Sequence, residues 1–538
     1  MRWFIYGVVL LLLASGCRQD AARVADAGED AAPAYGDTII QGSIGEPSTL
    51  IPALAADSAS SDINGLVYSG LVRYDKYLQI EGELAESWDI SEDGLTLTFH
   101  LRRDVRWHDG MPFTSEDVLF TYQLMVDPNT PTAYADRYLQ VVEAEAPDPH
   151  TFRVRYAEPL ASALISWGLA IHPKHLLEGQ DVSRSPLARA PVGTGPYRFV
   201  EWVSGQRLVL EANPDYFEGR PYIKRVIYRI IPDPSTMFLE LQAGNLDQMG
   251  LTPIQFARQT DTATFKRRFN KYRYPASSYV YLGYNLRRPM FQDQRVRQAL
   301  AHAINRQELV DGVLLGLGQV ATGPYKPGTW AHNPQVRDYP FDPARALELL
   351  AEAGWRDTDG DGLLDKDGRP LSFTILTNQG NDQRVKSGEI IQRRLREIGI
   401  DVRLRVIEWA SFLKEFVNTG NFDALIMGWT IPPDPDAYAV WHSSKTRPGE
   451  LNFIGFENAE VDELLEKGRR TLDQAERKRY YDRFQEILAE EQPYTFLFVP
   501  DALPVVAARF RGIEPAPAGI GYNFIRWYVP EGEQRYDW

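Results

Sequence analysis

Cys17 is the only cysteine among the 538 residues of the chain. No intrachain disulfide can form, so the fold cannot depend on one. Hydrophobic residues make up 44% of the chain and charged residues 24%, which is ordinary for a folded body of about three domains. The formal net charge of −15 argues against a nucleic-acid partner, because binding a phosphate backbone requires a basic surface.

The cysteine follows a short apolar segment. Arg2 precedes an unbroken apolar run over residues 3–14, which is about half the roughly 20 residues that a helix needs to cross a bilayer. A positive start, a short apolar stretch and small residues before a break are typical of a cleaved signal peptide. We predict a signal peptide over residues 1–16. The alternatives are a signal-anchor helix and an ordinary cleaved signal with a coincidental cysteine.

The small residues 14–16 before Cys17 resemble the lipobox of bacterial lipoproteins, although this chain has Ala14 where the commonest lipobox has leucine. The resemblance implies that Cys17 carries a diacylglyceryl group and becomes the mature N-terminus. Residues 17–36 have few large apolar side chains and cannot offset their ordering entropy, which predicts a flexible, lipidated tether. No later apolar run approaches spanning length, so we expect the lipid to be the only membrane attachment.

Strand-like and helical segments alternate irregularly, which predicts a mixed α/β chain. Residues 95–101 alternate apolar and polar side chains with period two, and residues 92–94 before them predict a hairpin turn. Thr114 and Asp117 predict the capping box of a helix. Helices are also predicted at 344–353, between Asp342-Pro343 and Gly354, and within 459–491, with a break near 471–473.

Several motifs resemble, in order and spacing, the peptide/nickel branch of the solute-binding proteins of ABC importers, the oligopeptide- and dipeptide-binding group. The resemblance covers the chain from about Ile39 to Pro504. The motifs are 66–72, 83–88, 99–102, 105–110, 116–118, 192–197, 213–217 and 295–300.

The resemblance implies an α/β fold of the periplasmic-binding-protein-like type II, with an additional inserted domain and two lobes that close on a ligand cleft. The first lobe would be discontinuous, the inserted domain would interrupt it, and two hinge strands would join it to the second lobe. The expected boundaries are 37–67, 191–273 and 492–538 for the first lobe, 68–190 for the inserted domain and 274–491 for the second lobe. The implied function is a monomeric, extracytoplasmic lipoprotein that captures short peptides for the permease subunits of an ABC importer and requires no cofactor.

Enzyme signatures are absent from the sequence. It contains no Gly-x-Ser-x-Gly elbow, no His-Glu-x-x-His, no P-loop and no Gly-x-Gly-x-x-Gly. The Gly-Thr-Gly-Pro segment at 193–196 predicts a tight backbone passage, since no Lys-Ser/Thr follows it to bind phosphate. Pro173 between His172 and His175 predicts a loop more than a metal site. An envelope hydrolase would need a nucleophile and a base, and the sequence offers no candidate pair.

The segment 426–444 carries the most informative side chains. It follows an apolar run at 424–427 that predicts a buried strand, so a rigid element would aim the loop. Aromatic residues and acids on a proline-stiffened loop suit a cleft that stacks on a peptide and binds its ammonium group by charge-assisted hydrogen bonds. In the family, an aspartate three residues past a Gly-Trp pair holds the α-ammonium. Here Gly428-Trp429 matches, but Pro432 stands at that position, which leaves Asp434 as the nearest acid.

The predicted ligand contacts combine this loop with the segment that re-crosses the hinge. They are Trp429, Asp434, Tyr438, Trp441, Tyr279, Tyr281 and Asn285. The alternative for the loop is that Trp429 and Trp441 are core residues and the acids are solvated. The alternative for the segment at the hinge is packing within a β-strand, with hydroxyls that face solvent. A neutral aromatic cleft would instead favour an oligosaccharide, and an opine-like conjugate or a metal chelate is another alternative ligand.

A second acidic segment places oxygen donors at EF-hand positions one, three, five and nine, with Gly362 at position six. Gly368 stands at position twelve, where a bidentate glutamate belongs. The segment predicts either a structural calcium site or a plain polar turn. The candidate ligands are Asp357, Asp359, Asp361 and Asp365.

Overall fold

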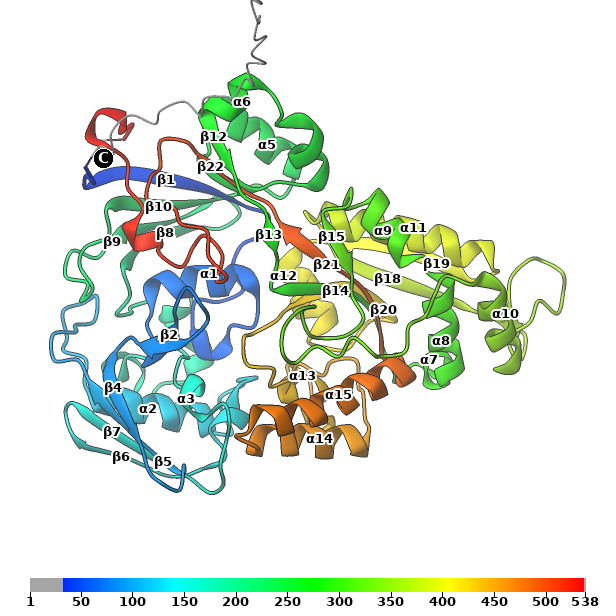
Figure 1. Cartoon of the computed structure of the whole chain (residues 1–538), viewed down its shortest axis with the longest axis horizontal. Coiled ribbons are helices and arrows are strands. Elements are labelled where there is room, and N and C mark those ends of the chain that lie inside the picture. Colours follow the sequence, from blue (N-terminus) through cyan, green and yellow to red (C-terminus); the bar gives the residue numbers. More distant parts are fainter. Residues whose placement is uncertain (1–31, 537–538) are drawn as a thin grey trace, which may run out of the picture.

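Three β-sheets, each with its own hydrophobic core, organise the protein (Figure 1). The computed structural model describes residues 32–536, so the predicted signal peptide and Cys17 lie outside the described residues. Among those residues, no helix is both long and apolar enough to span a bilayer. The three sheets define a first lobe, an inserted domain and a second lobe.

The first lobe is built on a seven-stranded sheet whose strands come from three separate stretches of the chain. Its central strand β1 pairs in parallel with β10, with Ile39 opposite Val226 in the core. Helices α1 (Ser58–Val67), α5 (Pro234–Ala243) and α6 (Ala263–Arg268) belong to this lobe. The strands in spatial order are β12 (Phe269–Lys271), β22 (Pro504–Ala507), β11 (Gln248–Gly250), β1 (Gly36–Ser43), β10 (Ile223–Ile230), β9 (Arg207–Ala212) and β8 (Tyr197–Val203).

The inserted domain carries a four-stranded antiparallel sheet with α2 (Ser115–Val126) packed against two of its strands. The predicted strand at 95–101 is β5, and both halves of the capping box between Thr114 and Asp117 are present. The remaining elements are β2 (Val72–Tyr74) with β3 (Ile80–Gly82), the sheet strands β4 (Ala85–Ile90), β5 (Thr96–Leu101), β7 (Thr151–Tyr156) and β6 (Val141–Asp148), and the short helices α3 (Ala163–Ser166) and α4 (Lys174–Leu177).

His108 joins two of the motifs that carry the family resemblance, the one at 105–110 and the one at 192–197. His108 Nδ1 accepts a hydrogen bond from Gly193 N, and its Nε2 lies 3.0 Å from the carbonyl oxygen of Gly195. A Cβ at Gly193 would lie 1.9 Å from the carbonyl oxygen of Val67. The segment therefore passes too close to the end of α1 for any side chain, which agrees with the predicted tight backbone passage and makes these motifs structural.

The second lobe has a seven-stranded mixed sheet that is covered on both faces. Helices α8 to α11 cover one face, and an aromatic-rich layer with α13 to α15 covers the other. The strands are β13 (Tyr274–Pro275), β21 (Tyr494–Ala502), β14 (Ser278–Tyr284), β20 (Ala424–Thr430), β18 (Ser372–Asn378) and β19 (Asp401–Ile407), with β15 (Gly318–Val320) paired to β21. The hairpin β16 (Asp365–Lys366) and β17 (Arg369–Pro370) lies apart.

Helices at 343–352, 459–470 and 474–491 lie near the predicted positions, among nine α-helices described in this lobe. The nine are α7 (Pro289–Gln292), α8 (Gln294–Ala303), α9 (Arg306–Gly312), α10 (Pro343–Glu352), α11 (Asp382–Glu397), α12 (Trp409–Ser411), α13 (Tyr438–Trp441), α14 (Ala459–Arg470) and α15 (Gln474–Glu491). Asp342 caps α10, and Gly354 follows it with a φ of +91°. The predicted break near 471–473 separates α14 from α15.

One boundary needs correction. The expected boundary at 492 places residues 494–502 in the first lobe, but they form β21, which pairs with β14 inside the second sheet. The strand is buried over most of its length, as expected for a central strand flanked by apolar layers. The chain therefore passes between the lobes at 271–274 and again at 502–504, where β21 ends and β22 begins.

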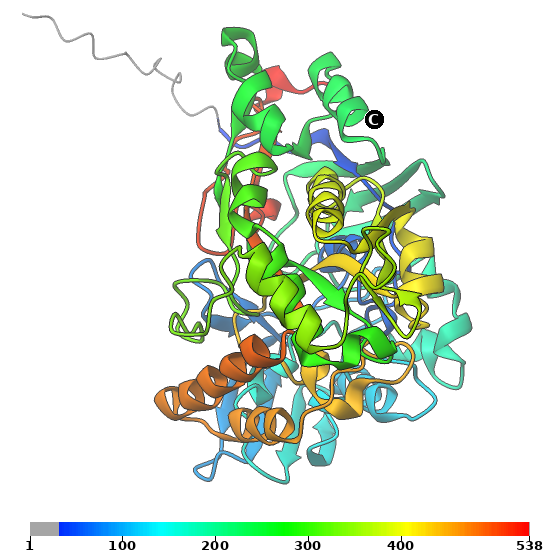
Figure 2. The same ribbon diagram turned by 90° about the vertical axis from the view of Figure 1, so that its right-hand side faces the viewer.

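The second lobe contacts both other parts of the molecule. Close to the crossing strands, a Cβ at Gly45 of the first lobe would lie 3.3 Å from Trp409, and one at Gly380 would lie 2.8 Å from the carbonyl oxygen of Pro232. Far from those strands, α14 and α15 extend beside the inserted domain (Figures 1 and 2).

Candidate functional site between the lobes

A cavity of about 430 Å³ lies between the two lobes beside the crossing strands. The end of β1 and the first half of α1 form its first-lobe wall, and residues 378–384 with Trp409 form the opposite wall. Asp501 and Leu503 close it at the crossing segment. A cavity of this size between two domains is the usual place for a small ligand.

Among the described residues, Arg384 is the only cation that lines this cavity. Its Nη1 donates a 2.8 Å hydrogen bond to Asn378 Oδ1, while its buried Nε has no partner. No carboxylate of the described residues forms an ion pair with it, and burial lowers its pKa to about 10. A desolvated cation without a counter-ion is costly, and such a group is suited to binding an anion.

Gly428 is needed for this placement of Arg384. A Cβ at position 428 would lie 2.9 Å from Arg384 Nη2 and 2.8 Å from the carbonyl oxygen of Tyr279. The glycine of the Gly-Trp pair therefore leaves room for the guanidinium group over β20. Because β18 and β20 are parallel neighbours, the residues that follow their carboxyl ends lie at the same edge of the sheet.

Three carboxylates line the same cavity, and two of them are paired. Asp382 forms an ion pair with Lys386, with 2.8 Å between Oδ2 and Nζ, and Asp501 forms one with Arg273, with 2.7 Å between Oδ2 and Nε. Asp62 on α1 is exposed to the cavity and has no hydrogen-bond or ion-pair partner among the described residues. Surrounding protein and the nearby Asp57 raise the pKa of Asp62 to about 6. The cavity thus contains one unpaired cation and one unpaired carboxylate, on opposite lobes.

A second cavity of about 320 Å³ lies between the inserted domain and the loop after β20. Residues 72–74 and 162–169 form one wall, and Pro432, Asp434 and Asp436 form part of the other. Asp434, the predicted ammonium partner, therefore lines a cavity. Its carboxylate, however, is already bound in bidentate fashion by Arg477, with two N–O distances of 3.1 Å.

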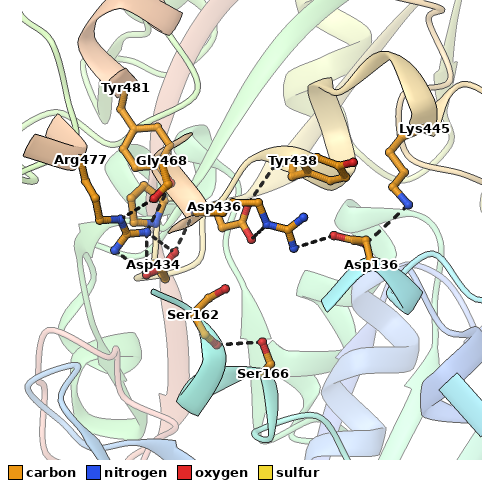
Figure 3. A network of polar contacts seen from close by, with 12 residues as sticks. Asp136, Ser162, Ser166, Asp434, Asp436, Tyr438, Lys445, Gly468, Arg477 and Tyr481 are labelled. Carbon is orange, nitrogen blue, oxygen red and sulfur yellow. Dashed lines mark hydrogen bonds and ion pairs between the residues drawn. The ribbon is translucent and has the colours of Figure 1, made fainter. Parts of the chain in front are cut away.

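The neighbouring Asp436 belongs to a buried ionic network that joins the second lobe to the inserted domain (Figure 3). Arg469 lies 3.0 Å from Asp436 and 2.9 Å from Asp136 of the inserted domain, and Lys445 approaches Asp136 at 3.8 Å. Burial opposes the charge of Arg469, but the two aspartates raise its pKa. Three cations thus balance three carboxylates, so this region holds no uncompensated negative charge for a ligand ammonium.

Four of the predicted ligand contacts are interior residues. The Tyr279, Tyr281 and Trp441 side chains are at most 3% exposed, and all three belong to the aromatic layer of the second lobe. Asn285 is 2% exposed, and its amide donates to the carbonyl oxygens of Gly420 and Phe422. These side chains hold the sheet and its turns, and they do not line either cavity, which corrects the sequence-based assignment.

The two remaining aromatic candidates are also committed to contacts within the protein. Trp429 stacks on Phe453 with ring centroids 5.7 Å apart, and its indole N–H donates to the Tyr494 hydroxyl at 3.3 Å. Tyr438 lies under the Arg469 guanidinium, 4.2 Å from the ring centroid. Tyr438 therefore supports the ionic network, and neither ring lines the 430 Å³ or the 320 Å³ cavity.

Residues 357–362 of the acidic segment are exposed. Oxygen atoms of Asp357, Asp359 and Asp361 lie within 4.8 Å of one another, whereas the Asp365 carboxylate accepts hydrogen bonds from the backbone and hydroxyl of Thr358. Each of the three grouped carboxylates also accepts a backbone N–H of the turn. The calcium site stays a prediction, with Asp365 turned away from the group.

Comparisons with known proteins show which family this is. The family model described as "Bacterial extracellular solute-binding proteins, family 5 Middle" matches residues 79–450. The chain belongs to this family. The oligopeptide-binding protein AppA of Bacillus subtilis is 36% identical over 97% of both chains. Its structure with a nonapeptide covers 93% of this family 5 protein and 100% of AppA, with a TM-score of 0.88.

Two further solved structures show the same fold with other ligands. NikZ from Campylobacter jejuni, in complex with Ni(L-His), has a TM-score of 0.83 at 30% identity, covering 91% of this chain and 99% of its own. DppA from Helicobacter pylori, in complex with the peptide STSA, also has a TM-score of 0.83, at 28% identity, covering 93% of this chain and 99% of its own. The family and these structures confirm the two-lobed type II fold and make this family 5 protein a solute-binding protein and not an enzyme.

Sequence reasoning missed Arg384 and Asp62. A usable signal existed for Arg384, which follows a strand-like apolar segment at 372–378 as Asp434 follows the one at 424–430. Parallel strands place such residues at one sheet edge, so the pattern of the two segments predicts that Arg384 and Asp434 follow strands ending at the same edge. No local signal separates Asp62 from the other acids of the chain, because its position depends on how the lobes meet.

Proposed function

We propose that this family 5 protein captures short peptides outside the cytoplasm and delivers them to an ABC importer, with the peptide carboxylate bound by Arg384. The observation that carries the proposal is the unpaired, partly buried guanidinium in the cavity between the lobes. A planar guanidinium binds a carboxylate through two parallel hydrogen bonds, which compensates the desolvation of both groups. The peptide complexes of AppA and DppA support a peptide as the ligand class.

A second candidate shares the carboxylate. NikZ is solved with Ni(L-His), and a metal–amino acid chelate could present its carboxylate to Arg384 in the same way. Native mass spectrometry of protein purified from its own host separates the two, because a co-purifying peptide and a nickel chelate differ in mass and isotope pattern. A peptide is the expected result.

The anion site is tested by pairing a substitution with a change in the ligand. Titration calorimetry compares Arg384→Gln with the unchanged protein, using one peptide with a free carboxyl end and its C-terminal amide. A charge-assisted hydrogen-bonded pair is worth roughly tenfold to a hundredfold in affinity, so the unchanged protein should prefer the free acid by that factor and the variant should not. Lys386→Gln is the control, because Lys386 is a cation on the same helix that pairs with Asp382 and does not line the cavity. This variant should keep the preference for the free acid. Equal affinities of the unchanged protein for acid and amide would refute the Arg384 site.

The proposal includes the membrane attachment. We infer that Cys17 carries the lipid and that residues 17–36 tether a monomeric body to the outer face of a membrane, which keeps the binding protein close to its permease. The support is the position of the single cysteine directly after a short apolar run and small residues.

A further inference from the structure

The cavity between the lobes contains two charges of opposite sign that form no ion pair with any residue of the described range 32–536. Arg384 lies on the second-lobe wall, and Asp62 lies on the first-lobe wall. The other two carboxylates of this cavity are neutralised by Lys386 and Arg273. We propose that Asp62 binds the ammonium group of the ligand, so that the two charged ends of a short peptide are held in one cavity between Asp62 and Arg384.

The second cavity offers a poorer place for an ammonium group. Arg477 and Arg469 already neutralise Asp434 and Asp436, and the unpaired charged residue among those lining this cavity is the cation Arg137. An ammonium group there would meet a region without net negative charge. The loop after β20, with Pro432 at the position where the family resemblance implies an aspartate, therefore supports the contact with the inserted domain, and the ammonium site is assigned to α1.

The environment of Asp62 favours the binding of a cation. Its carboxylate is exposed to the cavity, yet surrounding protein and Asp57 raise its pKa to about 6, so the ionised form is present at neutral pH at some cost. Asp62 is the fifth residue of α1, beyond the first turn where a helix N-terminus stabilises an acid. No cation within residues 32–536 pairs with this carboxylate, whereas a ligand ammonium would compensate its charge.

Binding at both ends has a mechanical consequence. Asp62 belongs to the first lobe and Arg384 to the second, so a ligand held at both ends bridges the lobes across the crossing strands. The ligand contributes its full binding energy only when the lobes are closed, which shifts the population towards the closed form. A short zwitterionic peptide meets this requirement, and a long one would have to place at least one end outside the cavity.

The inference rests on the proposed function and is tested by competition in native mass spectrometry. The probe is a tripeptide library supplied as equal amounts of free and N-acetylated forms. The unchanged protein should take up the free forms roughly tenfold to a hundredfold in preference to the acetylated forms, because acetylation removes the ammonium charge. Asp62→Asn should lose this preference. Asp382→Asn, which removes a carboxylate of the same cavity that Lys386 already neutralises, and Asp434→Asn should retain it.

The outcomes are distinct. Loss of the preference in Asp434→Asn with retention in Asp62→Asn would overturn the inference and place the ammonium on the loop. No preference in the unchanged protein would also overturn it. If the unchanged protein binds no tripeptide of either kind, the proposed function itself fails. Thermal melting guards against misfolding, because Asp62→Asn breaks no bond and removes an uncompensated charge, so its melting temperature should be unchanged or higher.

Discussion

Arg469→Met should weaken ligand binding although Arg469 lies outside the 430 Å³ cavity. The Arg469 side chain is 6% exposed, and it bridges Asp136 of the inserted domain and Asp436 of the second lobe at 2.9 and 3.0 Å. The Ala161 backbone N–H also donates to the Arg469 carbonyl oxygen at 2.7 Å, so this residue is central to the contact between the two parts. The substitution would leave two largely buried carboxylates facing each other, with Lys445 at 3.8 Å as partial compensation for Asp136.

The size of the effect follows from the burial of the pair. Removing one partner of a buried ion pair typically costs about 3–5 kcal/mol, and we take about 3 kcal/mol because Asp436 is 15% exposed and Lys445 remains. The pair with Asp136 exists only when the inserted domain and the second lobe are in contact, so much of this cost falls on the closed form. If the substitution makes the closed form a minor state, the apparent affinity falls in proportion to the population of the closed form, by up to about a hundredfold.

Calorimetry of Arg469→Met measures the affinity, and small-angle X-ray scattering measures whether the ligand-free protein becomes more open. Arg470→Met is the matched control, since its pair with Glu158 also joins the two parts at 2.7 Å but both side chains are about half exposed. An exposed pair is worth about 1 kcal/mol or less, so the control should lose less than about tenfold. Equal losses in the two variants, or an unchanged affinity of Arg469→Met, would refute the closure argument. In the double variant with Asp136→Asn, the two losses should be smaller than additive.

Three further predictions concern other parts of the molecule. Affinity for peptides with a free N-terminus should fall as the pH drops from 7 to 5, because the raised pKa of Asp62 means that its charge is present above about pH 6 and lost below it. The titratable groups around Asp62 are Asp57 and Tyr228. Asp62→Asn should flatten the dependence of affinity on pH measured by calorimetry. Cys17→Ser should leave the melting temperature unchanged and release the protein from membranes in cell fractionation, whereas a variant that stays bound would show that the apolar run is the anchor. Millimolar Ca²⁺ should raise the melting temperature and Asp361→Ala should abolish the rise, while no rise would mean that the acidic segment is a polar turn.

Individual helices and strands could be predicted from sequence because their signals are local, whereas the two-lobed architecture was implied by the family resemblance. Capping residues, period-two alternation and the glycine motifs act within a few residues, and β5, α2, α10 and the α14–α15 break formed where they were expected. The placement of β21 failed because residues 494–502 are equally apolar for either sheet, and only pairing with β14 decides between them. The aromatic candidates failed for a related reason, since an exposed stacking surface and a buried aromatic layer require the same residue types.

The charged residues show why the binding site was harder to predict than the fold. Asp434 and Asp436 look like free acids in the sequence, yet their partners Arg477 and Arg469 come from helices about 30 to 45 residues away in the chain. Asp62 and Arg384 look like ordinary surface residues, yet the way the lobes meet leaves both of them unpaired in one cavity. Whether a charge is available to a ligand depends on its tertiary neighbours, and a motif read residue by residue cannot contain that information.

The two contact zones between the lobes divide the energetics of closure. At the inserted domain, fixed cations and carboxylates neutralise one another, so this contact favours closure whether or not a ligand is present. At the cavity, Asp62 and Arg384 line the space between the lobes without an ion-pair partner among the described residues, and closure there brings two costly charges into a less hydrated environment. A ligand that carries both complementary charges removes that cost, whereas a ligand with only one leaves the other unpaired. A ligand with only one charged end leaves Asp62 or Arg384 desolvated and unpaired, and that free-energy cost makes the site selective for zwitterions. A site built for a hydrogen-bonding partner rejects the blocked analogue for the same reason.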